Sequence, residues 1–263
     1  MASKIVFDQV AKQFQPARGG PLVTALDGLS LSIEDRSFVC LVGPSGCGKS
    51  TLLNLVAGFD TPTRGSVTLE GQAISGPGPD RGVVFQEAAL FPWLTVIDNV
   101  CYGPKRRGVS RSIYVPAAEA LIEQVGLGRF TNSYPAELSG GMRQRVAIAR
   151  ALVNEPKVLL MDEPFGALDA QTRSLMQELL LKIWERHQRT VLFVTHDVDE
   201  AVFMADRVIV MSRPPGRILA DVHIDLPRER TFEMLTSSEL SSLKRQVLTL
   251  VRQEARAVSG EVA

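Results

Sequence analysis

The chain has 263 residues, of which 45% are hydrophobic and 22% charged, enough for one large domain or two small ones with a sizeable core. Its 29 basic and 29 acidic side chains cancel, so it lacks the basic excess typical of proteins that bind nucleic acid or anionic membranes. No apolar run reaches transmembrane length, and residues 1–10 contain no signal-peptide core. The three cysteines lack the spacing of metal ligands or disulfides, and the absence of such spacing predicts reduced thiols in a cytosolic protein.

Strand-like and helix-like segments alternate along the chain. In chain order, the predicted strands are 4–10, 29–33, 36–44, 65–74, 83–86, 157–164, 190–197, 207–212 and 217–224. The predicted helices are 50–59, 115–127, 140–153, 170–187 and 238–258, and the segment 14–21 is a predicted loop. Repeated strand–helix–strand alternation favours an α/β core with a parallel sheet, and the alternating pattern of 65–74 favours an antiparallel edge.

The chain divides into three predicted regions. Residues 1–86 and 155–225 form the α/β core, and residues 87–154 form an inserted helical subdomain, because their texture is helical and loop-rich. Residues 226–263 form a helical tail. Its apolar positions follow 3-4-3 spacing, which makes one stripe on a helix. We expect this stripe to pack on the chain's own body, with partner binding as the alternative.

The stretch "GPSGCGKS" matches the phosphate-binding loop pattern G-x-x-x-x-G-K-[ST] and lies between a predicted strand and a predicted helix. Its glycines let consecutive N–H groups face phosphate oxygens, and the following helix adds its dipole. Lys49 is expected to reach the β- and γ-phosphates, Ser50 to bind Mg²⁺, and Thr51 to support the phosphates. The expected ATP-binding residues of this loop are Gly43, Pro44, Ser45, Gly46, Cys47, Gly48, Lys49, Ser50 and Thr51.

Polar residues follow three further predicted strands. Asp162 and Glu163 end "VLLMDE", Gln86 ends "VVFQ", and His196 follows "VLFVT". The carboxyl ends of parallel strands share one edge, so we expect these residues to converge with Lys49. Asp162 would hold Mg²⁺ through water, and Glu163 would be the general base for the attacking water.

A second phosphate cradle is predicted at "LSGGM", where Ser139, Gly140 and Gly141 open a helix. It belongs to the helical insert and need not lie over the phosphate loop of its own chain. Two copies could pair about a two-fold axis, each placing this cradle on the γ-phosphate held by the other. ATP would then close a homodimer, and hydrolysis would open it.

In combination, the phosphate loop, Gln86, "LSGGM", "DE" at 162–163, "ALD" at 167–169 and His196 resemble an ATP-binding-cassette (ABC) ATPase over nearly the whole chain, to about residue 225. The resemblance implies a P-loop NTPase (RecA-like) core with an antiparallel β edge and an inserted α-helical subdomain. It implies that Gln86 senses Mg²⁺ and the γ-phosphate, that Ser139, Gly140 and Gly141 contact the ATP of the opposite chain, that Asp169 crosses the dimer interface, and that His196 holds the γ-phosphate. Phe14 stands where the family stacks an aromatic ring on adenine, although it could instead be a core residue.

The stretches around Gln86 and Asp162 further resemble the ATPase subunits of nitrate, aliphatic sulfonate and taurine importers. This implies a peripheral subunit on the cytoplasmic face of the plasma membrane, under a permease that receives solute from an extracytoplasmic binding protein. Organic sulfonate or taurine is the first candidate solute, against nitrate, cyanate, pyrimidine precursors and other small solutes. Phe91, Trp93 and Leu94 are expected to contact the permease, or else to pack the junction of the insert with the core.

Other ABC ATPases are the alternatives. Soluble cassettes of DNA repair and chromosome maintenance separate the two cradles by long coiled coils, whereas about ninety residues separate them here. Translation factors of this class carry two cassettes in one chain, whereas this chain carries one. An export cassette is a further alternative. The segment Phe91–Trp93 and the run after His196 favour an importer over an exporter. Intact Lys49 and Glu163 argue against a non-catalytic regulatory cassette.

Overall fold

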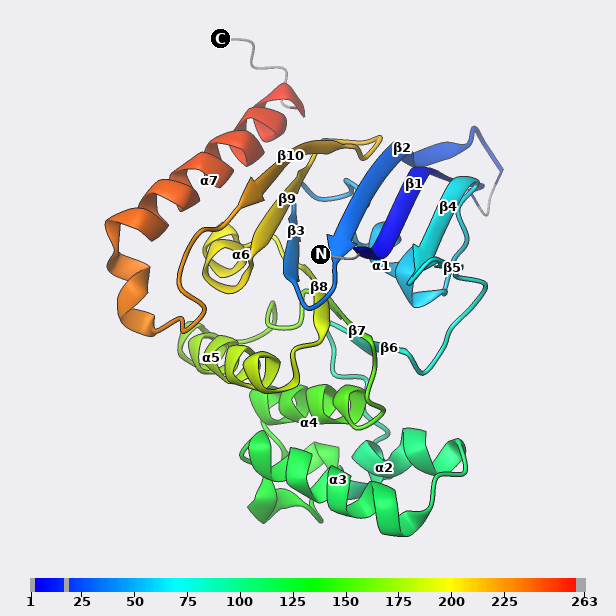
Figure 1. Ribbon diagram of the computed structural model, residues 1–263, viewed down its shortest axis with the longest axis vertical. Coiled ribbons are helices and arrows are strands. Elements are labelled where there is room, and N and C mark those ends of the chain that lie inside the picture. The colour runs from blue at the N-terminus through cyan, green and yellow to red at the C-terminus, as the bar shows by residue number, and fades with distance from the viewer. Residues whose placement is uncertain (1–2, 17–18, 259–263) are drawn as a thin grey trace. The chain divides into compact units, whose positions relative to one another are not determined.

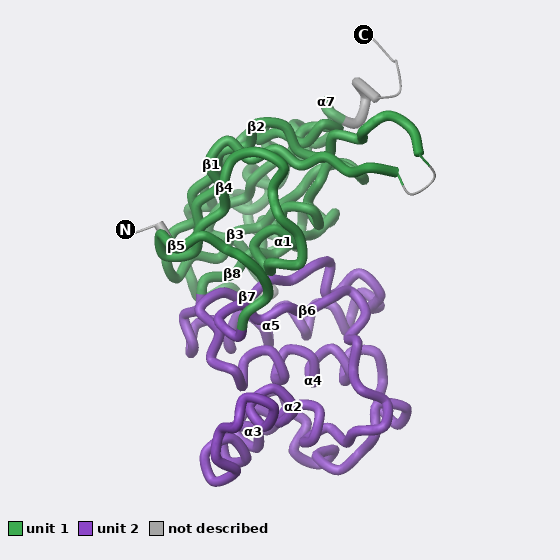
Figure 2. Tube along the Cα trace, turned by 90° about the vertical axis from the view of Figure 1, so that its right-hand side faces the viewer, with its two compact units in different colours: residues 1–78, 190–263 green, residues 79–189 purple. Residues whose placement is uncertain are grey.

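The computed structural model describes residues 3–16 and 19–258, which form two compact units (Figure 2). Unit 1 comprises residues 1–78 and 190–263, and unit 2 comprises residues 79–189. Residues 17 and 18 of the predicted loop and the last five residues of the predicted tail lie outside the described residues. In the part of the chain that is described, no helix has both the length and the apolar character needed to cross a bilayer.

Unit 1 contains two sets of strands and three α-helices in the described residues (Figure 1). Its strands are β1 (Ser3–Phe14), β2 (Val23–Glu34), β3 (Phe38–Val42), β4 (Arg64–Leu69), β5 (Gln72–Ala73), β8 (Thr190–Val194), β9 (Arg207–Met211) and β10 (Ile218–His223). Its helices are α1 (Lys49–Ala57), α6 (Val198–Met204), α7 (Ser238–Val258) and the 3-10 helix η3 (Phe232–Thr236).

The two sets of strands in unit 1 differ in direction. An antiparallel sheet has the order β2-β1-β4-β5, which is the predicted antiparallel edge. The second set runs β10-β9-β3-β8, with β3 parallel to both β8 and β9. Every residue of β3 and β8 is buried, as expected for parallel strands covered on both faces. The prediction of a parallel α/β core is therefore confirmed.

The first two strands are longer than predicted. β1 spans twelve residues rather than 4–10, and β2 spans twelve rather than 29–33. Gly28 lies inside β2 with φ +63, where the ladder with β1 is irregular, so the Asp-Gly pair makes a bulge rather than a turn. The predicted strand 65–74 is instead a hairpin of β4 and β5, because Glu70 and Gly71 both adopt positive φ angles.

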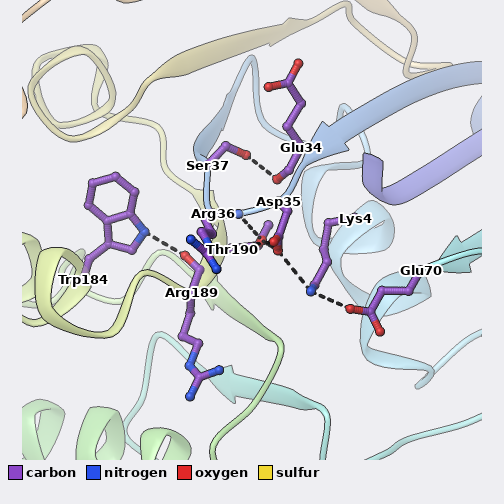
Figure 3. A network of polar contacts seen from close by, with 9 residues as sticks. All are labelled: Lys4, Glu34, Asp35, Arg36, Ser37, Glu70, Trp184, Arg189 and Thr190. Carbon is purple, nitrogen blue, oxygen red and sulfur yellow. Dashed lines mark hydrogen bonds and ion pairs between the residues drawn. The ribbon is translucent and has the colours of Figure 1, made fainter. Parts of the chain in front are cut away.

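A polar network fixes the start of β3 beside the start of β8 (Figure 3). The Ser37 hydroxyl donates to the Glu34 carbonyl at 2.7 Å, and the Arg36 N–H donates to the Thr190 hydroxyl at 2.9 Å. Lys4 pairs with Asp35 at 3.0 Å and with Glu70 at 2.6 Å. These contacts hold the register of the two strands whose far ends carry the phosphate loop and His196.

Unit 2 contains one parallel strand pair and a group of helices. Its strands are β6 (Arg81–Val84) and β7 (Val158–Asp162). Its helices are α2 (Val96–Arg106), α3 (Arg111–Gln124), α4 (Gly140–Leu152) and α5 (Ala170–His187), with the 3-10 helices η1 (Gly128–Phe130) and η2 (Pro135–Glu137). β6 begins and ends two residues before the predicted 83–86, so Gln86 lies just beyond the strand rather than at its end.

Candidate nucleotide site and second phosphate cradle

The phosphate loop of unit 1 joins the buried strand β3 to helix α1. Gly46 and Gly48 have φ angles of +77° and +92°, and Gly48 stands at the helix N-cap. Among the described residues no side chain caps the start of α1. The N-terminus of a helix presents backbone N–H groups and the positive end of the helix dipole, which suit an anion. A Cβ at Gly46 would meet nothing within 4 Å, whereas one at Gly48 would lie 2.6 Å from Leu26 Cδ2. The loop is open on one side and tightly backed on the other.

Lys49 is buried beneath this loop. Its ammonium donates to the carbonyls of Gly43 at 2.9 Å and Pro44 at 3.1 Å, and it lies 3.6 Å from the Cys47 sulfur. Burial raises the pKa of the Cys47 thiol, against an opposing effect of the lysine charge. Cys47 therefore fills the loop as a neutral thiol, and the Lys49 charge is fixed where phosphate oxygens are expected.

His196 lies at the same strand edge as the phosphate loop. β3 and β8 run parallel with Leu41 opposite Val194, and the Thr195 N–H donates to the Leu41 carbonyl at 3.2 Å. The phosphate loop follows one strand and His196 follows the other, and the histidine is exposed. Within unit 1, the structure therefore brings the phosphate loop and His196 to the same edge of the parallel strands.

Phe14 ends β1, opposite Val23, and its side chain is 40% exposed. This exposure excludes the alternative that Phe14 is a core residue. The Lys12 ammonium lies 4.9 Å from the centre of the ring, a cation–π contact that holds the ring at the surface.

Unit 2 brings Gln86 and Glu163 together. β6 and β7 run parallel with Val84 opposite Met161, so Gln86 and the Asp162–Glu163 pair follow the strands at one edge. A Cβ built on Gly166 would lie 3.4 Å from Gln86 Nε2 and 3.7 Å from a carboxylate oxygen of Glu163. Glu163 also has φ +44, a rare conformation for this residue type.

The second cradle opens helix α4. Ser139 is its N-cap, and the serine hydroxyl accepts from the Met142 N–H at 3.3 Å. Gly140 is exposed, whereas Gly141 is buried, and a Cβ there would lie 2.7 Å from Thr172 Cγ2. The two adjacent glycines thus have different roles: Gly140 leaves the start of α4 accessible, and Gly141 allows α4 to pack closely against α5.

Asp169 is the N-cap of α5, a role that the sequence interpretation missed. Its carboxylate accepts from the Thr172 N–H at 3.0 Å, and hydrogen bonds from Thr172 lower the pKa of this carboxyl below its usual value. An Asp placed directly before the helical stretch 170–187 is the signal that could have predicted it.

Helix α4 holds the segment after β6 through two polar side chains. Gln144 Nε2 donates to the Phe85 carbonyl at 3.0 Å. Arg150 donates to the carbonyls of Ala88 at 2.9 Å and Ala89 at 2.8 Å. The backbone on both sides of Gln86 is therefore fixed to the helix that begins with the second cradle. Sequence reasoning did not assign these two residues, although a buried glutamine in an apolar helix is a signal for such a role.

An aromatic cluster follows this segment. Phe91 packs on Trp93 and Tyr102 with ring-centre distances of 5.7 and 4.4 Å, and Trp93 is 70% exposed. Buried Asn99 holds the turn by accepting from the Phe91 N–H at 2.9 Å and donating to nearby carbonyls. An open pocket of about 440 Å³ within unit 2 is lined by residues 86–90, the first turn of α4 and the stretch 164–168. Trp93 is therefore a surface residue, which argues against the packing alternative for this side chain, whereas the Phe91 ring packs inside the aromatic cluster.

A glycine-rich loop between a buried parallel strand and a helix, and a second helix that opens with two adjacent glycines, are the features expected of a P-loop ATPase of the cassette type. Residues 26–166, over half of the chain, match the family described as ABC transporter, and the chain belongs to this family of ATP-hydrolysing, ATP-binding proteins. The resemblance inferred from the motifs is thereby confirmed.

Individual relatives indicate which ABC transporter subunits this chain resembles most in sequence. The nitrate import ATP-binding protein NrtD of Synechocystis sp. is 50% identical over 236 residues, which cover 88% of this chain and 89% of the relative. The taurine import ATP-binding protein TauB of Rhizobium johnstonii is 53% identical over 218 residues, 83% of each chain. Among solved structures, the dimeric ABC transporter cassette MJ0796 has a TM-score of 0.74 at 33% identity and covers 85% of this chain and 100% of its own. That cassette has also been solved in a dimeric post-hydrolysis state bound to ADP and Pi.

Proposed function

We propose that this chain is the ATPase subunit of an importer, in which ATP closes a dimer of cassettes and so powers uptake of a small anionic or zwitterionic solute through a permease. The observation that carries the proposal is the identity of about 50% to import subunits for nitrate and for taurine, together with both phosphate-binding elements. Aliphatic sulfonate or taurine remains the first candidate solute, and nitrate the second.

In unit 1, the phosphate loop binds the nucleotide. Backbone N–H groups of the loop and the start of α1 bind phosphate oxygens, and Lys49 neutralises the β- and γ-phosphate charge. Ser50 supplies a hydroxyl ligand to Mg²⁺, and His196 holds the γ-phosphate. Exposed Phe14 stacks on the adenine.

In unit 2, Asp162 and Gln86 serve the metal and Glu163 accepts the proton of the attacking water. Hydroxyl, carboxylate and amide oxygens are the ligands that Mg²⁺ prefers, so the donor set fits the metal. When bound, Mg²⁺ neutralises charge that develops on the phosphates.

The second cradle serves the ATP of a partner copy. Exposed Ser139 and Gly140 are available to another chain, and Asp169 lies exposed at the start of α5, where it can contact that chain. A dimeric cassette structure supports this arrangement. The homodimer answers why one chain carries two phosphate-binding sequences.

The aromatic cluster of unit 2, formed by Phe91, Trp93 and Tyr102, binds a cytoplasmic helix of the permease. Trp93 offers a large exposed apolar side chain, and Asn99 and Arg150 hold the backbone beneath it. The subunit works at the cytoplasmic face of the plasma membrane, and a binding protein outside the membrane delivers solute to the permease. Aromatic anchors of this kind dominate the binding energy of many interfaces.

Two variants test the chemistry. Lys49→Ala should lose most ATP affinity, because the charge aimed at the phosphates is gone. Glu163→Gln should bind ATP and lose turnover, since an amide cannot accept the proton of the water. Near-normal hydrolysis by the glutamine variant would remove Glu163 from the role of general base.

Mixing two inactive variants tests the dimer. When Lys49→Ala chains are mixed with Ser139→Arg chains, one composite site of the mixed dimer collects both lesions and the other has none. Some ATPase activity should return on mixing. Mixed dimers that form without recovery of activity would contradict the arrangement. Uptake of taurine and of nitrate by the assembled transporter then separates the two solutes.

A further inference from the structure

The C-terminal segment from Pro227 to Val258 packs onto unit 1 beside the helix that follows His196. α7 lies along α6 and β9 (Figure 1). Leu240 and Val247 of its apolar stripe are buried. The prediction that this stripe packs on the chain's own body is confirmed. The family model matches residues 26–166, and the C-terminal segment follows the matched residues.

α6 is a helix of seven residues that begins two residues after His196. Two turns of helix are too short to be stable alone, so tertiary contacts determine where α6 lies. Asp197 caps its start by accepting from the N–H groups of Asp199 and Glu200, and the Asp197 N–H donates to the Thr195 hydroxyl at 3.0 Å. Any shift of α6 therefore moves the peptide that carries His196.

The C-terminal segment holds both ends of this helix. At the first turn, the Lys244 ammonium of α7 pairs with the Asp199 carboxylate at 2.6 Å. At the last turn, Arg230 donates to three carbonyls, those of Phe203 at 2.8 Å and of Val202 and Ala205 at 3.1 Å.

Arg230 also anchors itself to its own segment, because its Nε donates to the Pro227 carbonyl at 2.8 Å. The carbonyls at the end of a helix have no partner within the helix and carry the negative end of its dipole. A planar guanidinium with several donors can satisfy several of them at once. Burial against this helix end lowers the pKa of the guanidinium, and the neighbouring Asp206 carboxylate opposes that effect.

We propose that Arg230 is a positioning residue for His196, and that it and Lys244 fix the two ends of α6 so that the histidine stands where the γ-phosphate is bound. The inference rests on the role given to His196 under "Proposed function". Its specific consequence concerns the difference between ATP and ADP, because only ATP carries the γ-phosphate.

The test compares affinities for ADP and for a non-hydrolysable ATP analogue, measured by titration calorimetry on the full chain. His196→Ala is the reference variant, Arg230→Gln and Arg230→Lys are the test variants, and Arg245→Gln, which changes an exposed arginine on α7, is the matched control. Arg230→Gln should lower the ratio of analogue affinity to ADP affinity about three- to thirtyfold and leave ADP affinity unchanged. The lysine variant should recover part of this ratio, and the control should keep it.

Three results would overturn the inference. An unchanged ratio in Arg230→Gln, beside a lowered one in His196→Ala, would leave Arg230 without influence on the histidine. Equal loss of affinity for both nucleotides would make Arg230 a purely structural residue. An unchanged ratio in His196→Ala would contradict the role of the histidine itself, and that failure concerns the proposed function.

A second variant covers the case in which Arg230→Gln does not fold. Lys244→Gln removes one partly exposed ion pair at the other end of α6. It should lower the same affinity ratio by a smaller factor, about two- to threefold. A Lys244→Gln protein with the ratio of the control would count against the proposal.

Discussion

Replacing Asn99 with alanine should destabilise the protein by about 2 to 3 kcal/mol and loosen the turn that carries Trp93. The Asn99 side chain is fully buried, and its oxygen accepts from the Phe91 N–H at 2.9 Å. Its amide nitrogen lies 3.0 to 3.1 Å from the carbonyls of Phe91, Leu94 and Thr95.

The magnitude follows from which of these groups keep a partner. An amide nitrogen has two hydrogens, so it cannot satisfy three carbonyls fully. The Phe91 carbonyl still accepts from the Leu94 N–H, and the Thr95 carbonyl still accepts from the Asn99 N–H. The loss therefore falls on the Phe91 N–H and the Leu94 carbonyl. A buried polar group left without a partner costs about 1 to 3 kcal/mol. Phe91 and Leu94 are only half-buried, so each group falls near the lower end of this range, and the two together give about 2 to 3 kcal/mol.

Urea unfolding followed by the fluorescence of buried Trp184 measures this loss, in a background where Trp93 is replaced by phenylalanine. Asn132→Ala, an exposed asparagine in unit 2, is the control and should change stability little. A loss below about 1 kcal/mol in Asn99→Ala would show that water replaces the side chain without cost, and would refute the reasoning.

Three further predictions follow from single features. Gly48→Ala should lose more stability in urea than Gly46→Ala, because both glycines have positive φ angles but only a methyl at Gly48 would lie 2.6 Å from Leu26 Cδ2; equal losses would exclude the clash. Burial, with two neighbouring arginines, lowers the pKa of His187, so the unfolded chain binds this proton more readily and stability should fall as the pH drops below about 6.5; His187→Gln should reduce that fall, and identical pH profiles would contradict it. Trp93→Ala should keep the ATPase rate of the purified subunit within about threefold while uptake by the assembled transporter falls much further, and unchanged uptake would place the permease contact elsewhere.

Much of the fold was predictable because its signals are local. The buried strands β3, β7 and β8 read as apolar runs, and α1, α4 and α5 have helical spacing or a glycine loop before them. The bulge at Gly28 was not predictable, since an Asp-Gly pair usually marks a turn and only pairing with β1 keeps it in a strand.

The sequence motifs predicted the residues of the candidate site, but they did not predict the residues that hold those side chains in position. Motif spacing indicates Lys49, Gln86 and Glu163, because phosphate chemistry demands those groups at strand ends. No local pattern indicates that Arg230 binds the end of α6, since its partners lie 25 to 28 residues earlier in the chain. Such pairings arise from tertiary packing and become visible only in the fold.

The segment 85–89 is attached to α4 through its backbone, so the course of this backbone does not depend on which side chains the segment carries. Gln144 and Arg150 donate to the carbonyls of Phe85, Ala88 and Ala89, and every amino acid offers a carbonyl. The Arg150 guanidinium also lies 5.9 Å from the centre of the Phe91 ring. Substitutions at residues 87–89 can therefore keep the backbone attached to α4 during evolution, whereas a change at Phe91 would remove a contact of one of the two donors.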